Sequence, residues 1–184
     1  MKPKLFIVVG NSLKYDELSA KLSELFDCEQ KIINEPEIQG KPEEILRHKA
    51  KRAYEIFQHP VLVDDVSVNI EELGGFPGPY MRDFFDFLSP YEMGVKFAGS
   101  RISATCRLGL CRGPGDILIA EGTFDGKIVV PKEKDHKDKW FEFFVQLDGM
   151  DKPMIEYSME EKNEFSHRGL AMKNLLEILK KESK

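Results

Sequence analysis

The sequence predicts an α/β protein built on a mixed β-sheet. Two apolar runs, residues 5–9 and 61–63, alternate with helical patterns, as strands do in a sheet with parallel pairs. Between residues 100 and 130, β-branched residues flank a Gly-Pro-Gly turn, which predicts a long antiparallel hairpin. The 184 residues are expected to form one domain, 1–184, with a substantial core.

The first two passages each run from strand to helix. Residues 5–9 predict a buried strand that ends at Gly10-Asn11, and a helix follows with apolar residues at Leu18, Leu22, Leu25 and Phe26. A short strand is expected around residues 31–34. The second helix should begin near Pro42, because proline suits the first turn. Its apolar stripe consists of Leu46, Ala50, Ala53 and Phe57.

The rest of the chain predicts a turn, a strand and a final helix. GGFPGPY at 74–80 is typical of a rigid turn before a helix that begins near Tyr80. WFEFF at 140–144 predicts a strand with buried faces, and a ring that stacks on a nucleotide base is the alternative. The final helix carries Met172, Leu175, Leu176 and Leu179 on one face and ends in lysines.

Composition limits the partners. With 41% hydrophobic and 32% charged residues the chain is typical of a globular protein, and a net charge of −5 argues against a broad basic surface for nucleic acid. Cys28, Cys106 and Cys111 lack zinc-type spacing and are expected to be buried thiols. The apolar run 5–9 is too short to span a membrane. We therefore expect a cytoplasmic protein that binds neither nucleic acid nor membrane.

One candidate site is the turn after the first strand. Gly10 and Asn11 precede a helix, whose free N–H groups and positive dipole end favour an anion, and Lys14 adds a full charge. A phosphate site is one interpretation, and a simple turn is the commoner one.

A second candidate is the acidic set Glu37, Asp64 and Asp65. Mg²⁺ prefers oxygen ligands, usually one or two carboxylates with phosphates and water. Neighbouring side chains on a strand point to opposite faces, so Asp64 and Asp65 are expected to share an ion only if the strand ends there. Exposed acids at a strand terminus are the alternative.

The third candidate is EEKNEFSHRGLA at 160–171. Ser166 is expected to cap the final helix, which places His167 and Arg168 in its first turn. Cations there oppose the helix dipole unless an anion joins them, and this favours a functional role.

Together these residues resemble the inosine triphosphate pyrophosphatase family, which hydrolyses non-standard purine nucleoside triphosphates. The resemblance covers nearly the whole chain. Its motifs are GN…K at 10–14, EIQG at 37–40, the helix bearing Lys49, VLVDD…LGGFPGPY at 61–80, FDGKIV at 124–129 and EKN…SHR at 161–168. LGGFPGPY and SHR at these separations are specific to that family.

The resemblance implies a two-lobed α/β fold with a long mixed central sheet flanked by helices, and a deep active-site cleft between the lobes. It also implies a homodimer. The implied reaction is Mg²⁺-dependent, with Mn²⁺ as an alternative, and cleaves ITP, dITP or XTP between the α- and β-phosphates to give the monophosphate and pyrophosphate.

The resemblance also implies residue roles. Glu37 and Asp65 would hold the metal, Asp65 would orient or deprotonate the attacking water, and Asp64 would support them. The triphosphate would be held by Gly10, Asn11, Lys14 and Lys49. Lys14 would also have a catalytic role. The base and sugar-phosphate region would be contacted by Phe141, Glu142, Lys162, His167 and Arg168.

The chain departs from the family pattern in three places. Val9 and Val66 stand where the family usually has hydroxyl residues able to contact phosphate. The base signature Phe-Gly-Trp/Tyr-Asp-Pro is replaced by KWFEF at 139–143, with Trp140 in the place of glycine. The alternatives are therefore a member with altered base specificity, or one that binds nucleotide without turnover.

Overall fold

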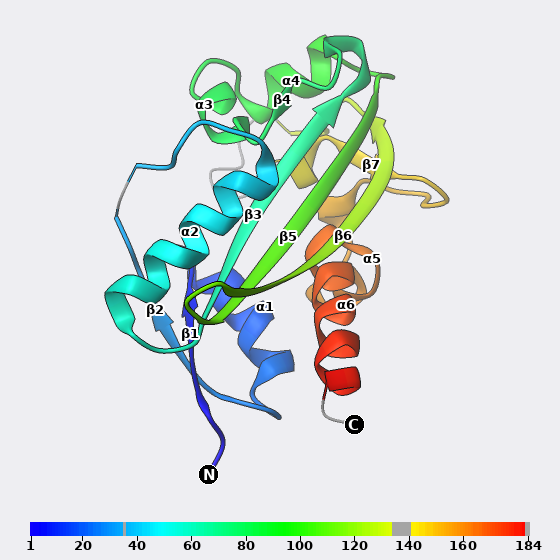
Figure 1. Ribbon diagram of the computed structural model, residues 1–184. Helices are drawn as coiled ribbons and strands as arrows, with labels where there is room; N and C mark the ends of the chain where they lie inside the picture. The colour runs from blue at the N-terminus through cyan, green and yellow to red at the C-terminus, as the bar shows by residue number, and fades with distance from the viewer. Residues whose placement is uncertain (35, 134–140, 183–184) are drawn as a thin grey trace. The chain divides into compact units, whose positions relative to one another are not determined.

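The structure is a computed structural model that describes residues 1–34, 36–133 and 141–182 (Figure 1). In these residues a seven-stranded sheet has the order β2-β1-β3-β5-β6-β7, with β4 paired to β3. Parallel and antiparallel pairs both occur, and helices flank the strands, which confirms the predicted α/β class with a mixed sheet.

The chain divides into two compact units. Unit 1 comprises Met1–Asp65, Cys106–Gly122 and Leu170–Lys184. Unit 2 comprises Val66–Thr105 and Thr123–Gly169. The chain passes between the units within β3, β5, β6 and α6, so these elements contribute residues to both.

Unit 1 begins with an alternation of strands and helices. These elements are β1 (Lys4–Val8), α1 (Ser12–Leu22), β2 (Asp27–Lys31), α2 (Pro42–Phe57) and the start of β3 (Val61–Ile70). β1 pairs in parallel with both β2 and β3. The strand expected at 31–34 lies earlier, at Asp27–Lys31. The pattern does not reveal this position, because β2 is an edge strand and its sequence, DCEQK, has no run of apolar residues.

The first two helices of unit 1 begin as predicted. Asn11 caps α1, since its Oδ1 accepts a hydrogen bond from the Leu13 N–H at 2.8 Å. α1 ends at Leu22, short of the expected Phe26. α2 starts at Pro42 and lies across the front of β3 in Figure 1.

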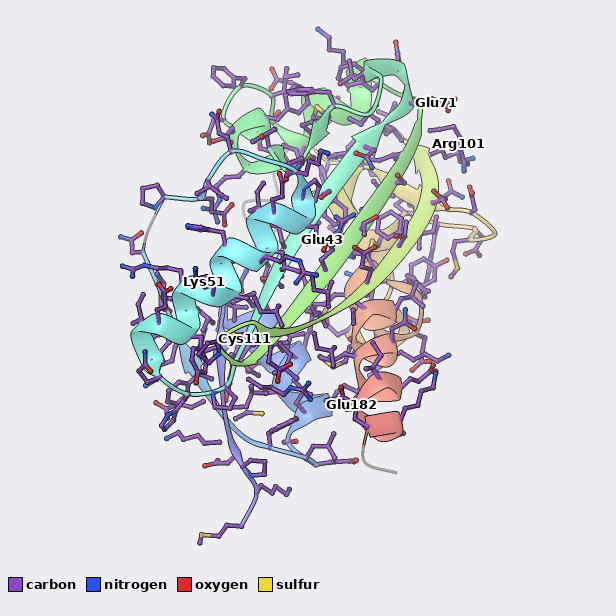
Figure 2. All side chains as sticks on the ribbon, in the orientation of Figure 1. Glu43, Lys51, Glu71, Arg101, Cys111 and Glu182 are labelled. Atoms are coloured by element: carbon purple, nitrogen blue, oxygen red, sulfur yellow. The ribbon has the colours of Figure 1, made fainter. Side chains whose placement is uncertain are left out.

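The apolar stripe of α2 packs as expected. Its buried members pack against β1 and β3, in a cluster that contains Phe6, Val8, Leu46, Ala50, Ala53, Val61 and Val63. Phe57 is partly buried against the same cluster. Glu43 and Lys51 lie on the exposed side of α2 (Figure 2).

The predicted hairpin consists of β5 (Arg101–Gly113) and β6 (Asp116–Ile128). The Arg107 side chain on β5 donates a hydrogen bond to the Glu121 carboxylate on β6 at 2.7 Å. The two strands are antiparallel, because the short turn at Pro114-Gly115 reverses the chain. Arg112 near the turn binds Glu182 of α6 (His167–Glu182) in unit 1. Figure 2 labels Glu182 and Cys111, and all three cysteines are free thiols, with Cys106 and Cys111 buried.

Unit 2 holds a second core. Its remaining elements are η1 (Glu71–Leu73), β4 (Pro77–Gly78), α3 (Met81–Phe85), α4 (Pro90–Lys96), η2 (Phe141–Phe143), β7 (Val145–Leu147), η3 (Met154–Glu156) and α5 (Met159–Phe165). At its surface Arg101 forms a two-pronged ion pair with Asp148, and Glu71 lies near Arg101 (Figure 2).

The turn GGFPGPY is confirmed. Gly74, Gly75 and Gly78 have φ of 63°, 93° and 59°, which side chains other than glycine rarely adopt, and α3 follows at Met81.

The strand predicted for WFEFF is wrong in its described part, because residues 141–143 form a 3₁₀ helix. This tight turn buries Phe141, Phe143 and Phe144 together, whereas a strand with one buried face would bury only alternate residues. Trp140 and Lys139 lie outside the described residues.

In the described part of the chain, no helix has the length and apolar character needed to cross a membrane.

Candidate functional site

Asp64 and Asp65 lie where β3 extends beyond its neighbour. β1 ends at Val8, which is in register with Val63, so the acidic pair is the first part of β3 past that end. The prediction that the strand ends at the pair is wrong, since β3 continues to Ile70. What ends there is β1, and the carboxyl ends of parallel strands are where α/β sheets commonly bind ligands.

The two carboxylates point to opposite faces of the strand. Asp65 shares the face of Val61 and Val63, which α2 covers, and its Oδ1 lies 3.5 Å from the Lys49 Nζ. On the other face, Asp64 pairs with Lys14 of α1 at 3.0 Å. One lysine from each helix therefore serves one acid of the pair.

Glu37 completes this group. It precedes α2 and its Oε1 lies 2.6 Å from the Lys49 Nζ. The same ammonium donates to the backbone oxygen of Asp64 at 3.1 Å. We call the residues Lys14, Glu37, Lys49, Asp64 and Asp65 the acid–lysine cluster, and all five belong to unit 1.

Burial perturbs this cluster. Asp65 is 7% exposed, and its Oδ2 is buried without a hydrogen-bond partner in the part of the chain that the structure describes. Desolvation raises the pKa of Asp65 to about 6, although Lys49 opposes this rise. Burial acts to lower the pKa of Lys49, but the charges of Asp65 and Glu37 outweigh it and raise the pKa above 10.5. Lys49 is therefore a charged ammonium.

The cluster fits a hard divalent cation. Hard cations bind carboxylate oxygens such as the buried Asp65 Oδ2, which accepts no hydrogen bond from the described residues, and Glu37 supplies a second, half-exposed carboxylate. Among residues 1–34, 36–133 and 141–182, no group of three or more Asp, Glu, His or Cys is placed to hold a metal. A Mg²⁺ ion would thus rely on these two acids together with substrate and water oxygens, which is its usual environment.

The turn between β1 and α1 leaves room for an anion. Gly10 and Asn11 are exposed, and a Cβ added to Gly10 would meet no atom within 4 Å. The helix cap uses the Asn11 Oδ1 as an acceptor, so the Nδ2 amide of Asn11 would still be able to donate to an anion. Lys14 is about one-third exposed.

The predicted base-side residues all lie in unit 2, and the structure brings them together in two contacts. Lys162 is buried, and its Nζ lies 2.6 Å from the Glu142 Oε2. His167 is 2% exposed, and its ring packs edge-on against Phe141 at 5.2 Å between centroids. Arg168 follows, partly buried. Phe141 is itself buried in the core of unit 2, and its proposed stacking on a base stays a prediction.

Ser166 caps the start of α6, as predicted. Its Oγ accepts a hydrogen bond from the Gly169 N–H at 3.1 Å. Sequence reasoning missed Gly169 itself, where an added Cβ would lie 2.1 Å from the Asn163 carbonyl oxygen. This glycine lets the end of α5 touch the start of α6, and its position directly after SHR was the available signal.

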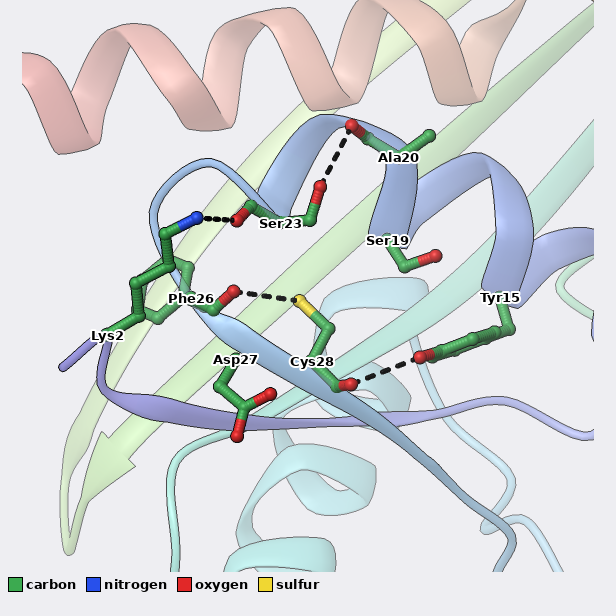
Figure 3. A pocket seen from close by; sticks show the side chains of 8 residues that line it. All are labelled: Lys2, Tyr15, Ser19, Ala20, Ser23, Phe26, Asp27 and Cys28. Atoms are coloured by element: carbon green, nitrogen blue, oxygen red, sulfur yellow. Dashed lines mark hydrogen bonds between the residues drawn. The ribbon is translucent and has the colours of Figure 1, made fainter.

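A separate pocket lies in unit 1 (Figure 3). It has a volume of about 390 Å³ and is lined by Lys2, Tyr15, Ser19, Ala20, Ser23, Phe26, Asp27 and Cys28. Its polar groups largely bond to neighbouring backbone: Tyr15 donates to the Cys28 carbonyl and Lys2 to the Ser23 carbonyl. None of the predicted site residues lines it.

Comparisons with known proteins find relatives that match nearly the whole chain. The family model described as the Ham1 family matches residues 5–178. An inosine triphosphate pyrophosphatase of Schizosaccharomyces pombe is 34% identical over 182 residues, 97% of this chain and 96% of that protein. Inosine triphosphate pyrophosphatase 2 of Trypanosoma cruzi is 36% identical over 174 residues, 92% of this chain and 88% of that protein.

Solved structures have the same fold. The structure of a HAM1 protein from Coxiella burnetii has a TM-score of 0.81 at 22% identity and covers 98% of this chain and 100% of that one. The Staphylococcus aureus Ham1 protein has a TM-score of 0.73 at 19% identity, with coverage of 97% and 100%.

Proposed function

Because this chain belongs to the Ham1 family, we propose that it is a nucleoside triphosphate pyrophosphatase that acts on non-standard purine nucleotides such as ITP, dITP and XTP. The observation that carries the proposal is the buried Asp65. Its Oδ2 has no hydrogen-bond partner among the described residues, and the charges that act on it are those of Lys49, Glu37 and Asp64. Such a group is poised to bind a cation or to accept a proton.

The proposed reaction adds one water molecule across the bond between the α- and β-phosphates. The nucleoside monophosphate and pyrophosphate leave. Displacement at phosphorus needs little covalent help, so it is accelerated mainly by positioned charge and a positioned water. The acid–lysine cluster supplies charges of both signs within unit 1.

Within that cluster, Asp65 is proposed as the base that takes the proton from water. With a pKa of about 6 it is ionised at neutral pH yet still basic enough to accept a proton. Lys14 and Lys49 are proposed to bind phosphate oxygens beside the exposed Gly10–Asn11 turn, and Asp64 to position Lys14. Mg²⁺ or Mn²⁺ held by Glu37 and Asp65 would neutralise charge that develops on the phosphates.

Base recognition is proposed for unit 2. Lys162 uses one of its N–H groups on Glu142, which holds the buried ammonium in place and leaves other donors for a ligand. Hypoxanthine and xanthine carry a carbonyl oxygen where adenine carries an amino group. A lysine ammonium can donate a hydrogen bond to that oxygen but not to the amino group, so it favours hypoxanthine and xanthine over adenine. His167, Arg168 and Phe141 are proposed to contact the base and sugar-phosphate region.

The test is pyrophosphate release, measured with Mg²⁺ and with Mn²⁺ across ITP, XTP, dITP, the four standard nucleotides and several pyrimidine analogues. We expect ITP and XTP to be preferred. Asp65→Asn should lower kcat by about 10²-fold or more, as for the loss of a general base. Lys51→Met, on the exposed side of the same helix as Lys49, should leave turnover unchanged.

Other outcomes have definite meanings. A pyrimidine that outcompetes every purine would indicate that the altered sequence KWFEF at 139–143 recognises a different base. Tight nucleotide binding without pyrophosphate release by the folded protein would reject turnover in favour of a binding role. We also propose a cytoplasmic homodimer, supported by the family resemblance, and light scattering of the purified protein tests the oligomeric state.

A further inference from the structure

We propose that Lys49 competes with the divalent cation for Glu37 and Asp65, so that the nucleotide-free protein binds the metal weakly until a phosphate draws Lys49 away. The inference deepens the proposed function, on which it rests for the identity of the cation and the phosphate. It concerns only residues of unit 1.

The Lys49 ammonium is surrounded by oxygen atoms, as a bound metal ion would be. Its Nζ lies 2.6 Å from the Glu37 Oε1, 3.1 Å from the Asp64 carbonyl oxygen and 3.5 Å from the Asp65 Oδ1. An ammonium has three N–H donors, and here it meets three oxygens. The side chain is only about one-quarter exposed, so the charge depends on these oxygens for compensation.

The same oxygens are those a hard divalent cation prefers. Two like charges a few ångströms apart in a partly buried site repel strongly, because screening by water is weak there. Lys49 and a divalent cation would therefore weaken each other's binding at Glu37 and Asp65. Departure of Lys49, or the arrival of a further anion, would relieve this repulsion.

A nucleotide supplies that anion. Phosphate oxygens can accept the hydrogen bonds that Lys49 gives to Glu37, which releases the carboxylate for the metal. Coupling of this kind is reciprocal, so phosphate binding raises metal affinity and the metal raises phosphate affinity. Lys49 would then first limit the access of the metal to the two carboxylates and, once the nucleotide arrives, bind its phosphate.

The rival hypothesis is that the cation binds the Asp65 Oδ2 and does not displace Lys49. Because no described residue forms a hydrogen bond with this atom, a cation could bind it while Lys49 stays on Oδ1 and Glu37. In that arrangement Lys49 does not compete, and its removal would leave metal affinity unchanged or weaken it through loss of an ordered site.

The experiment is a Mn²⁺ titration without nucleotide, followed by electron paramagnetic resonance, on the wild type, Lys49→Met and Lys14→Met. Competition predicts that Lys49→Met binds Mn²⁺ at least about fivefold more tightly than the wild type, the lower end for linked sites. Lys14→Met removes an equal charge, paired 3.0 Å from Asp64, and controls for general electrostatics. Equal tightening in both variants, or no tightening in Lys49→Met, would overturn the proposal.

A second measurement uses the wild type and so survives a poorly folded variant. Reductive methylation followed by mass spectrometry reports the accessibility of each lysine. Saturating Mg²⁺ without nucleotide should speed labelling of Lys49 and leave that of the exposed Lys51 unchanged, and an unchanged Lys49 rate would contradict displacement. Neither measurement needs turnover, so failure of this inference is distinguishable from absence of pyrophosphate release.

Discussion

Replacement of Asp65 by asparagine should stabilise the metal-free protein while it lowers kcat by about 10²-fold or more. The carboxylate is 7% exposed and burial raises its pKa from 3.8 to about 6. An ionised group in such a place costs free energy that a neutral amide of the same shape does not. The ionised Asp65 is therefore expected to lower the free energy of unfolding of the metal-free protein.

The magnitude follows from the pKa difference. About two pKa units at about 1.4 kcal/mol each give about 3 kcal/mol. The pKa is higher in the folded state, so between about pH 4 and pH 6 the folded state holds a proton that the unfolded state has lost. Wild-type stability therefore falls as pH rises through this window and stays lowered above it. Asp65→Asn should gain up to about 3 kcal/mol at pH 7.5, but only about 1 kcal/mol at pH 4.5.

Urea unfolding in buffer with a chelator, at both pH values, measures the difference. Asp64→Asn is the matched control. Asp64 is equally buried but pairs with Lys14 at 3.0 Å, so its replacement should lower stability at pH 7.5. The reasoning is refuted if Asp65→Asn is less stable than the wild type at pH 7.5, or if its gain is the same at both pH values.

Three further predictions concern unit 2, the β1–α1 turn and the metal. Glu142→Gln leaves the buried Lys162 without its counter-charge and should cost about 3 kcal/mol in urea unfolding, with a rise in the KM for ITP that Glu142→Asp partly reverses. Gly169→Ala places a Cβ 2.1 Å from the Asn163 oxygen and should cost about 1–3 kcal/mol, whereas Gly10→Ala points into open space and should change stability by less than about 0.5 kcal/mol. Chelation should abolish pyrophosphate release, and Mg²⁺ or Mn²⁺ should restore it; full activity in excess chelator would contradict the metal requirement.

Local patterns in the sequence predicted much of the fold. The stripe of α2, its start at Pro42, the glycine turn before α3 and the Ser166 cap all depend on residues within a few positions of one another. The polar edge strand β2 was misplaced because an edge strand with few buried side chains has no apolar pattern to detect. The aromatic run at 141–143 predicts a strand but forms a 3₁₀ helix, because aromatic side chains can be buried in either conformation.

Sequence patterns are enough to predict the α/β class, the family resemblance and the set of acids and lysines. The folded structure is needed to identify the partners of these residues: Lys14 meets Asp64 across 50 positions of sequence, and Lys49 lies among the oxygens of Glu37, Asp64 and Asp65. It also decided that β3 runs past the acidic pair and buries it, which raises the pKa of Asp65. These properties depend on burial and on contacts between distant segments, and neither is encoded in the spacing of neighbouring residues.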